Sequence, residues 1–528
     1  MHYAVVFTLL LVFVFGLGLL ARRISVPYPI LFVLGGLVIG FIPHLPQLRL
    51  DPNFVFFIFL PPLLYIQAFN TSWRDFSREY GPILLLAIGL VIVTTITVAY
   101  AAYLVIPAFP LAAGFVLGAI ISPPDAIAAS AIAQRLGLPR RIVTILEGES
   151  LVNDATSLVI FKIALVAAIT PGLSLFGGVW WPGQALYIAG GGVAVGLAVG
   201  WVINWIRARL IGDGVQIILT ISLLTPFVSY LAGEVTNVSS VLAVVTTGLY
   251  LGRSSPEVIT PTIRLQAQAF WEIIIYILNG MVFVLIGLQL PGILHGMNEH
   301  WWPRPFLYAV LINVVCIGVR LFWVFPGAYL PRLLIKAIRR REPKPDWRQV
   351  FIIGWSGMRG VVSLAAALAL NGLPDFPRGH LVQFLSFSVI LVSLVFQGLT
   401  LPTLIRTLGI ADDGSAAQEE IEARHQISRA VLEKIDEIRR EEKFPASAID
   451  RVEQIYRDRD LSLQDELADQ LGWSDSRHHL LSLRRLHRSM VATERRTLLV
   501  LRRDEIIGDD VLHKIEHELD LEEARLKF

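Results

Sequence analysis

The sequence predicts an all-α, polytopic membrane protein with about thirteen transmembrane helices and a helical cytoplasmic tail. Of its 528 residues, 54% are hydrophobic and only 17% are charged, whereas soluble domains carry about 25% charged residues. The apolar runs lie almost entirely in the first three quarters of the chain, and Glu, Arg and Asp gather in the last quarter. We therefore expect a transmembrane domain over residues 1–409 and a cytoplasmic helical tail over residues 410–528.

Apolar runs that span a bilayer, or nearly span it, recur along the first domain. They begin near residues 4, 28, 53, 82, 110, 148, 184, 214, 238, 267, 305, 349 and 381. The first run has neither a preceding basic region nor a small-residue cleavage site, which indicates a retained helix rather than a signal peptide.

Arginine and lysine gather in every second loop between these runs. The basic loops contain Arg22 and Arg23, Arg74 and Arg78, Arg135 to Arg141, Arg207 and Arg209, Arg253 and Arg264, and the block 332–348. Basic loops lie on the cytoplasmic side of a membrane. We expect a multi-pass protein of the cell (inner) membrane, with the N-terminus outside and the tail in the cytoplasm.

Two apolar runs, at corresponding places in the two halves, are interrupted in their middles. The first holds Pro123 and Pro124, which lack backbone N–H groups and free the carbonyls of the preceding turn. The second is Gly354-Trp-Ser-Gly-Met-Arg-Gly360, whose glycines weaken a helix. Paired interruptions of this kind predict a transporter built from two inverted six-helix repeats, with its site at the midplane.

The tail alternates apolar and charged residues at helical spacing, which predicts amphipathic helices. A solvated helical domain is the simplest interpretation, and a regulatory or dimerising role is the alternative.

The net charge of +2 averages basic membrane loops with a mixed tail, so we expect no nucleic-acid partner. The single cysteine, Cys316, excludes an intrachain disulfide framework and a cysteine-rich metal site. It lies in an apolar run, where we expect it to pack.

Residues 147–154, Glu-Gly-Glu-Ser-Leu-Val-Asn-Asp, place acidic groups inside a membrane helix. An ionised Asp at the centre of such a helix costs about 2.5 to 3.5 kcal/mol, so it needs a partner, an ion or a proton. On a helix, Ser150 and Asp154 share one face, and Glu149 and Asn153 share the next. Hard oxygen ligands suit a small cation, and one carboxylate can hold either a cation or a proton. Asp154 is the first candidate for this exchange, with a structural hydrogen bond between helices as the alternative.

Two further charged residues lie at the interruptions. Asp125 begins a new half-helix, where the helix dipole favours a carboxylate, and we expect it to cap that helix, to coordinate a cation, or both. Arg359 lies in the second interruption, and a buried arginine needs a carboxylate. Because Asp154 must stay free to titrate, Glu149 is its best partner by residue type, and we expect a structural Glu149–Arg359 ion pair.

An enzyme alternative comes from Gly354-Trp-Ser-Gly357, which matches the Gly-x-Ser-Gly pattern of rhomboid intramembrane serine proteases. Such a serine needs a histidine base within hydrogen-bond reach. The histidines map to loops, to the N-terminus and to the tail, so we expect a transporter and not an enzyme. A membrane sensor is a third interpretation, but the tail carries no recognisable output module.

With these residues together, the chain resembles the monovalent cation/proton antiporters, specifically the bacterial type of the sodium/proton exchanger branch. The resemblance covers about residues 5–408 and is carried by Leu60-Pro-Pro-Leu-Leu64, Ser122-Pro-Pro-Asp125, Gly148-Glu-Ser-Leu-Val-Asn-Asp154 and Gly357-Met-Arg-Gly360. It implies exchange of Na⁺, before K⁺ or Li⁺, for H⁺, with no cofactor. It further implies a homodimer with alternating access and a role in pH homeostasis.

The resemblance also assigns roles to residues. Asp154 would carry the cation and the proton, with Asn153 as its neutral neighbour and Asp125 at the crossover, while Glu149 and Arg359 would form the stabilising pair. Asn153 stands where the electrogenic branch has a second Asp. A single titrating carboxylate fits the exchange of one cation for one proton, which is electroneutral.

One position departs from the family. Many relatives carry an acid four residues after the second proline of the Pro-Pro-Leu-Leu motif, where this chain has Ile66, followed by Gln67. Either Gln67 supplies a neutral oxygen, or the site relies on Asp154, Ser150 and backbone carbonyls near Ile121 and Ser122. The choice between sodium, lithium and potassium depends on this difference.

Overall fold

The computed structural model describes residues 2–24, 27–42, 56–170, 181–210, 214–258, 261–295, 304–334, 345–370, 373, 376–412, 414–440, 444–454 and a few isolated positions beyond. It divides into two compact units, residues 1–412 and 413–528. The expected boundary, after residue 409, lies three residues earlier. In the described residues, all regular secondary structure is helical, as the all-α prediction requires.

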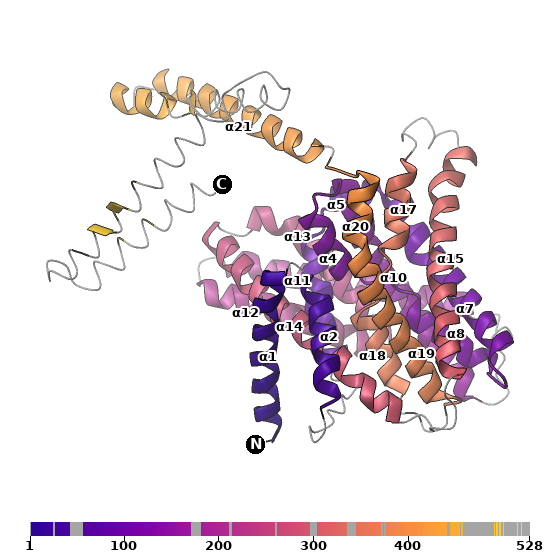
Figure 1. Cartoon of the computed structure of the whole chain (residues 1–528). Helices are drawn as coiled ribbons and strands as arrows, with labels where there is room; N and C mark the ends of the chain where they lie inside the picture. The colour runs from indigo at the N-terminus through magenta and orange to yellow at the C-terminus, as the bar shows by residue number, and fades with distance from the viewer. Residues whose placement is uncertain are drawn as a thin grey trace. The chain divides into compact units, whose positions relative to one another are not determined.

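The first unit is a bundle of helices that Figure 1 draws side by side. Its elements are α1 (His2–Ile24), α2 (Tyr28–Gly40), α4 (Leu60–Asn70), α5 (Trp73–Arg78), α6 (Tyr80–Leu84), η1 (Leu85–Leu90), α7 (Val91–Val105), α8 (Leu111–Ile121), α9 (Ala126–Arg135), α10 (Arg140–Ile169), α11 (Trp181–Arg209), α12 (Val215–Val235), α13 (Ser240–Val258), α14 (Pro261–His295), α15 (Arg304–Leu334), α17 (Trp347–Trp355), α18 (Val361–Ala369), α19 (Gly379–Val392), η4 (Ser393–Gln397) and α20 (Gly398–Leu408). Each predicted apolar run overlaps helical structure.

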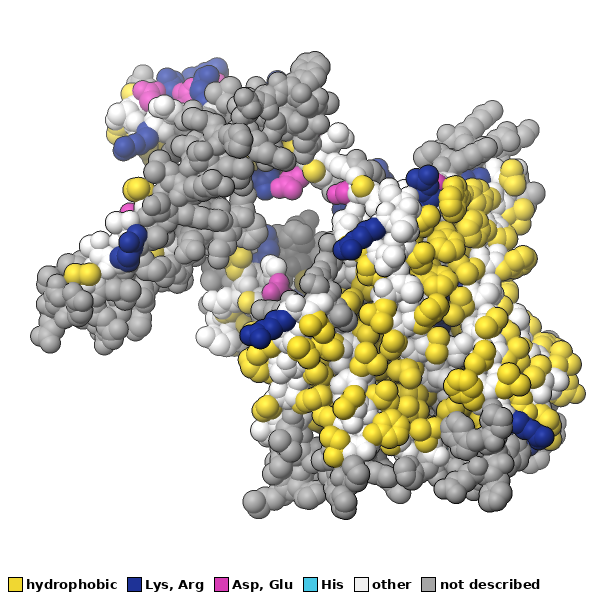
Figure 2. Space-filling view, in the orientation of Figure 1, with side chains coloured by type: hydrophobic (Ala, Val, Ile, Leu, Met, Phe, Trp, Pro, Cys, Tyr) yellow, Lys and Arg dark blue, Asp and Glu magenta, His cyan; other side chains and the backbone are white. Residues whose placement is uncertain are grey.

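Membrane insertion explains why the first unit is helical throughout. Within a bilayer every backbone polar group needs a partner inside the protein, and a helix supplies it locally. Among the described residues, eight helices are long and apolar enough to cross a membrane, and three more are apolar but shorter. Figure 2 shows hydrophobic side chains over most of the visible face of this bundle. The expected count of about thirteen spans, and the inverted repeats, stay predictions.

The two predicted interruptions are present. The run that contains Pro123 and Pro124 is split into α8 and α9 by the segment 122–125. The run that contains Gly354 is split into α17 and α18 by the segment 356–360. The backbone N–H of Asp125 donates to the carbonyl of Met358 at 2.6 Å. The two interruptions therefore meet inside the bundle, although they are far apart in the sequence.

Two apolar clusters hold the first unit together. The larger cluster includes α7, α8, α15 and α19, with buried residues such as Val116, Ile312 and Phe387. The smaller cluster joins α4 to α13 around Tyr65 and Val244. Buried polar residues gather at the two interruptions and in the middle of α10. This part of the bundle contains the candidate site.

The described part of the second unit is mainly α21 (Ser415–Arg440). Its buried residues Ile421, Ser428 and Ile435 recur every seven positions, which is the spacing of one helix face. Arg439 donates to Asp450 at 2.8 Å within the same unit. The expected amphipathic helix is therefore present over these residues, whereas much of the rest of the tail lies outside the described residues.

Candidate functional site

The carboxyl ends of the two half-helices are each capped by an arginine. The carbonyl of Ile121, the last residue of α8, accepts a hydrogen bond from Arg359 Nε at 3.0 Å. The carbonyls of Ile353 and Gly354, at the end of α17, accept from Arg320 Nη2 and Nε, each at 3.1 Å. The last carbonyls of a helix have no partner within it and attract cations. The arginines therefore supply donors that the interruptions make necessary.

The amino ends of the other half-helices face carboxylate and hydroxyl oxygens. Asp125 caps α9, because its Oδ1 accepts from the N–H of Ile127 at 2.8 Å. Its Oδ2 lies against the start of α18, where a Cβ added at Gly360 would be 1.6 Å from it. Only glycine at position 360 permits this approach. The capping role predicted for Asp125 is thus present in the structure.

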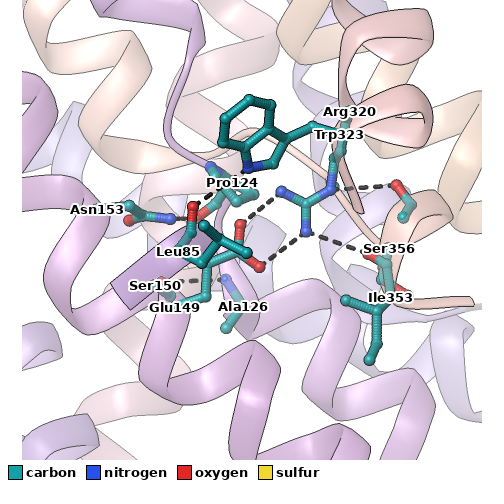
Figure 3. A network of polar contacts seen from close by, with 12 residues as sticks. Leu85, Pro124, Ala126, Glu149, Ser150, Asn153, Arg320, Trp323, Ile353 and Ser356 are labelled. Carbon is teal, nitrogen blue, oxygen red and sulfur yellow. Dashed lines mark hydrogen bonds and ion pairs between the residues drawn. The ribbon is translucent and has the colours of Figure 1, made fainter. Parts of the chain in front are cut away.

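Helix α10 is held against the first interruption by two polar side chains. Ser150 Oγ accepts a hydrogen bond from the N–H of Ala126 at 3.3 Å, and Asn153 Nδ2 donates to the carbonyl of Pro124 at 3.2 Å. Figure 3 shows both contacts beside the proline. Asn153 therefore partners a backbone group at the interruption, and it positions the next residue, Asp154.

Asp154 lines a small cavity at this crossing. Its side chain is buried, and among the described residues none donates a hydrogen bond to its carboxylate. The cavity is lined by Leu60, Leu63, Leu64, Gln67, Pro123, Asp125, Ile127, Ser150, Asp154, Gly360, Val361, Val362 and Ser363. The structure thus brings four of the predicted residues, Asp154, Asp125, Ser150 and Gln67, to one cavity.

The expected ion pair between Glu149 and Arg359 is wrong. Glu149 forms a bidentate pair with Arg320 of α15, with Nη1 to Oε1 at 2.6 Å and Nη2 to Oε2 at 2.9 Å. Both side chains are 1% exposed. Figure 3 shows the carboxylate and the guanidinium facing each other. Arg320 approaches from the helix opposite Glu149, and Gly357 gives it room, since a Cβ there would lie 2.3 Å from Arg320 Cδ.

Arg359 uses its donors on other groups. Besides the Ile121 carbonyl, it donates to the carbonyl of Gly357 and, through Nη2, to Cys316 Sγ at 2.8 Å. Its backbone N–H donates to Ser393 Oγ at 2.9 Å. Arg359 therefore joins the two interruptions to α15 and η4. Cys316, expected only to pack, also accepts a hydrogen bond.

Two predicted accessory residues do not line the cavity. The Ile121 carbonyl is taken by Arg359, and the Ser122 hydroxyl donates to the carbonyl of Ala119 at 3.1 Å. The freed carbonyl that α10 does use is that of Pro124. Gln67, which was expected to supply a neutral oxygen in place of the missing acid, lies at the cavity, whereas Ile66, which stands at the position of that acid, does not line it.

Sequence reasoning missed Arg320 and Ser363. Arg320 lies in the apolar run that begins near residue 305, and an arginine inside such a run is a signal for a buried partner. Ser363 follows the second interruption by three residues, but a serine in an apolar helix carries no comparable signal. Ser363 becomes visible only when the structure places it at the cavity.

The serine of the rhomboid-like pattern is not poised as a nucleophile. The Ser356 hydroxyl donates to the carbonyl of Ile352, one turn back in α17, at 2.7 Å. His295 ends α14 and His380 is the second residue of α19. The expectation that these two histidines fall in loops is therefore wrong, although each lies at the end of its helix.

The described residues contain no group of three or more His, Cys, Asp or Glu side chains that would hold a metal ion.

The sequence is similar to a known protein family and to individual members of it. The transmembrane sodium/hydrogen exchanger family matches residues 9–407. An uncharacterized Na⁺/H⁺ exchanger of Mycobacterium tuberculosis is 33% identical over 516 residues, which are 96% of this chain and 93% of that protein. A sodium, potassium, lithium and rubidium/H⁺ antiporter of Bacillus subtilis is 35% identical over 402 residues, 72% of this chain and 58% of that protein.

The fold has a solved counterpart. The sodium proton antiporter MjNhaP1 of Methanocaldococcus jannaschii superimposes with a TM-score of 0.61 over 77% of this chain and 99% of that chain, at 18% sequence identity. Interrupted helices that meet beside a buried carboxylate, in a membrane bundle of this fold, define a secondary transporter. This chain belongs to the sodium/hydrogen exchanger family. It is a multi-pass membrane antiporter of cations and protons, and it is not an enzyme.

Proposed function

We propose that this antiporter exchanges Na⁺ for H⁺, one for one, and that Asp154 holds the cation and the proton in turn. The observation that carries the proposal is the position of Asp154, which is 6% exposed, lines the cavity and accepts no hydrogen bond from the described residues. An ionised carboxylate in such a place costs about 2.5 to 3.5 kcal/mol at the centre of a membrane helix. Either a cation or a proton removes that cost, so the two compete.

The other ligands in the proposal are oxygens already at the cavity. Ser150 presents its hydroxyl, and Gln67 is half-buried in the wall formed by α4. Asp125 is committed through Oδ1 to the cap of α9. Its second oxygen adds negative charge beside the site, which strengthens the attraction for a monovalent cation.

Electroneutral exchange follows from the charges. A bound Na⁺ and a bound H⁺ each add one positive charge to the same set of side chains. If Asp154 is the residue that changes occupant, the net charge of the loaded site is the same in both directions of transport. No cofactor is needed, since the transported ions are the only species that change.

The remaining parts of the proposal concern the molecule in its membrane. We place the protein in the cell's inner membrane, with the N-terminus outside and residues 410–528 in the cytoplasm, because basic residues recur in alternate loops. The proposal includes a homodimer because the resemblance to the family implies one. Alternating access would move the crossing of the interrupted helices relative to the other helices. pH homeostasis is the expected physiological role.

K⁺/H⁺ exchange at the same site is the second candidate. Gln67 stands beside the position at which many relatives carry an acid, and a neutral amide favours the strongly hydrated Na⁺ less than a carboxylate would. The Bacillus subtilis relative is named for sodium, potassium, lithium and rubidium. These two observations favour a broad cation range.

The test uses the purified full-length protein in proteoliposomes with an imposed pH gradient. Na⁺, Li⁺ and K⁺ are added in turn, at two clamped membrane potentials, and protein-free liposomes are the control. The proposal predicts that each active cation relaxes the gradient, that Na⁺ has the lowest KM, and that the rate is the same at both potentials. A lower KM for K⁺ would select the second candidate, and a rate that follows the potential would contradict electroneutral exchange.

A further inference from the structure

Ser363 carries a buried hydroxyl that has no role in the proposed exchange at Asp154. It lies on α18, is 1% exposed and lines the cavity with Asp154 and Asp125. Among the described residues, its Oγ has no hydrogen-bond partner. An unpartnered buried hydroxyl costs about 1 to 3 kcal/mol, so its presence at this cavity calls for an explanation.

Several other buried hydroxyls of this bundle donate to carbonyls of their own helices, although those of Thr94 and Ser386 also have no partner among the described residues. Thr95 Oγ1 donates to the carbonyl of Val91 at 2.7 Å, and Ser229 Oγ donates to the carbonyl of Thr225 at 2.9 Å. Both use the carbonyl four residues earlier, which an unbroken helix places beside the side chain. The unpartnered state of Ser363 is therefore not the rule for serine or threonine in this protein.

The interruption explains why Ser363 differs. It is the third residue of α18, so two of the four residues before it, Arg359 and Gly360, belong to the non-helical segment 356–360. Gly360 has φ −144° and ψ −135°, which is far from helical values. The chain therefore lacks the helical turn whose carbonyl the Ser363 hydroxyl would otherwise take. The same interruption that opens the cavity leaves this hydroxyl facing it without an intrahelical acceptor.

We propose that Ser363 Oγ is a ligand of the transported cation, and this inference rests on the proposed function. A hydroxyl oxygen carries two lone pairs and no charge. Ser363 thus adds a neutral oxygen, from the second interrupted helix, to the oxygens of Asp154, Ser150 and Gln67. Because it changes the number of ligands and not the charge of the site, it sets cation affinity and selectivity without altering the exchange ratio.

The experiment compares Ser363→Ala and Ser363→Cys with wild type in the proteoliposome assay. Cysteine keeps nearly the volume of serine but replaces a hard oxygen with sulfur, which is a poor ligand for alkali cations. A ligand role predicts that both variants raise the KM for Na⁺ by about three- to tenfold. It also predicts that both keep the maximal rate within about twofold and change the ratio of the KM values for Na⁺ and K⁺.

Ser386→Ala is the matched control. Ser386 is fully buried on α19, its hydroxyl also has no partner among the described residues, and it does not line the cavity. It should keep the wild-type KM for every cation. If Ser363→Cys behaves as wild type while Ser363→Ala does not, Ser363 only fills space and the inference is overturned.

Failure of this inference is distinguishable from failure of the proposed function. Wild type and Ser386→Ala test the function, because neither alters Ser363. If both exchange cations for protons and the two Ser363 variants keep wild-type KM values for Na⁺, Li⁺ and K⁺, the function stands and the ligand role is refuted. A change in the maximal rate alone refutes it equally.

Discussion

Arg320 and Arg359 are two buried arginines with different tasks. Arg320 carries the buried ion pair with Glu149 and caps α17, while Arg359 caps α8 and contacts Cys316. Desolvation makes an isolated buried charge expensive, and removing one partner of a buried pair costs about 3 to 5 kcal/mol. Glu149 is therefore a structural residue of the site, which leaves Asp154 on the same helix to exchange ions.

The pairing predicts the outcome of two double-mutant cycles. Glu149→Gln combined with Arg320→Gln should show a coupling free energy of about 1 to 3 kcal/mol, because the two side chains share two charged hydrogen bonds. Glu149→Gln combined with Arg359→Gln should show a coupling below about 0.5 kcal/mol. The measurement is the free energy of unfolding of each variant in detergent. Equal coupling in the two cycles would contradict the assignment of Arg320 as the partner.

For single residues, the sequence predicted which residue types form the site better than it predicted which side chains contact each other. The acids of residues 147–154 follow from charge in an apolar run, and Asp125 follows from its place after two prolines. The partner of Glu149 did not follow, since it lies 171 residues away and two arginines compete for the pair. Choosing between them requires the positions of α15 and of the second interruption, which depend on packing of the whole bundle.

The two interrupted helices are the elements that create the site. Their carboxyl ends are capped by Arg320 and Arg359, and their amino ends lie beside Asp125. The backbone bond from Asp125 to Met358 joins the two interruptions directly. A carboxylate between helix amino ends is stabilised by their dipoles. The half-helices therefore hold a cavity lined by two carboxyl groups, those of Asp125 and Asp154, within an apolar bundle.

This crossing depends on the absence of a side chain at Gly360. Gly360→Ala would place a Cβ 1.6 Å from Asp125 Oδ2, so we expect it to displace Asp125 and to lose most exchange activity. Gly318→Ala is the control, since Gly318 is exposed on α15 and a Cβ there would meet nothing within 4 Å. It should stabilise the helix by up to about 1 kcal/mol. Unfolding temperature and gradient relaxation of both variants measure this, and normal exchange by Gly360→Ala would contradict the close crossing.

Prolines and glycines made both interruptions predictable, because their backbone effects are local. The π-helical segments η1 and η4 carry no such signal. In η1 the carbonyl of Leu85 accepts a hydrogen bond from Trp323 Nε1 at 3.3 Å. That contact joins segments 238 residues apart, so the helical pattern of the sequence alone does not reveal it.

For the whole molecule, composition and apolar periodicity were enough to predict an all-α membrane protein. They do not fix which helices pack together, since most apolar side chains suit lipid and protein equally. The site therefore depends on long-range packing that brings α4, α10 and the interrupted helices to one cavity. In this assembled bundle the Asp154 carboxylate faces the cavity and accepts no hydrogen bond from the described residues.

The central claim is that Asp154 exchanges a cation for a proton, and one comparison tests it directly. Wild type and Asp154→Asn are reconstituted in proteoliposomes with an imposed pH gradient, and Na⁺-induced relaxation is recorded at a clamped membrane potential. Asparagine keeps the shape of the side chain but removes the charge and the titrating proton. We expect wild type to relax the gradient and Asp154→Asn, with an unchanged unfolding temperature or a higher one, to leave it intact. Relaxation by Asp154→Asn at the wild-type rate would contradict the claim.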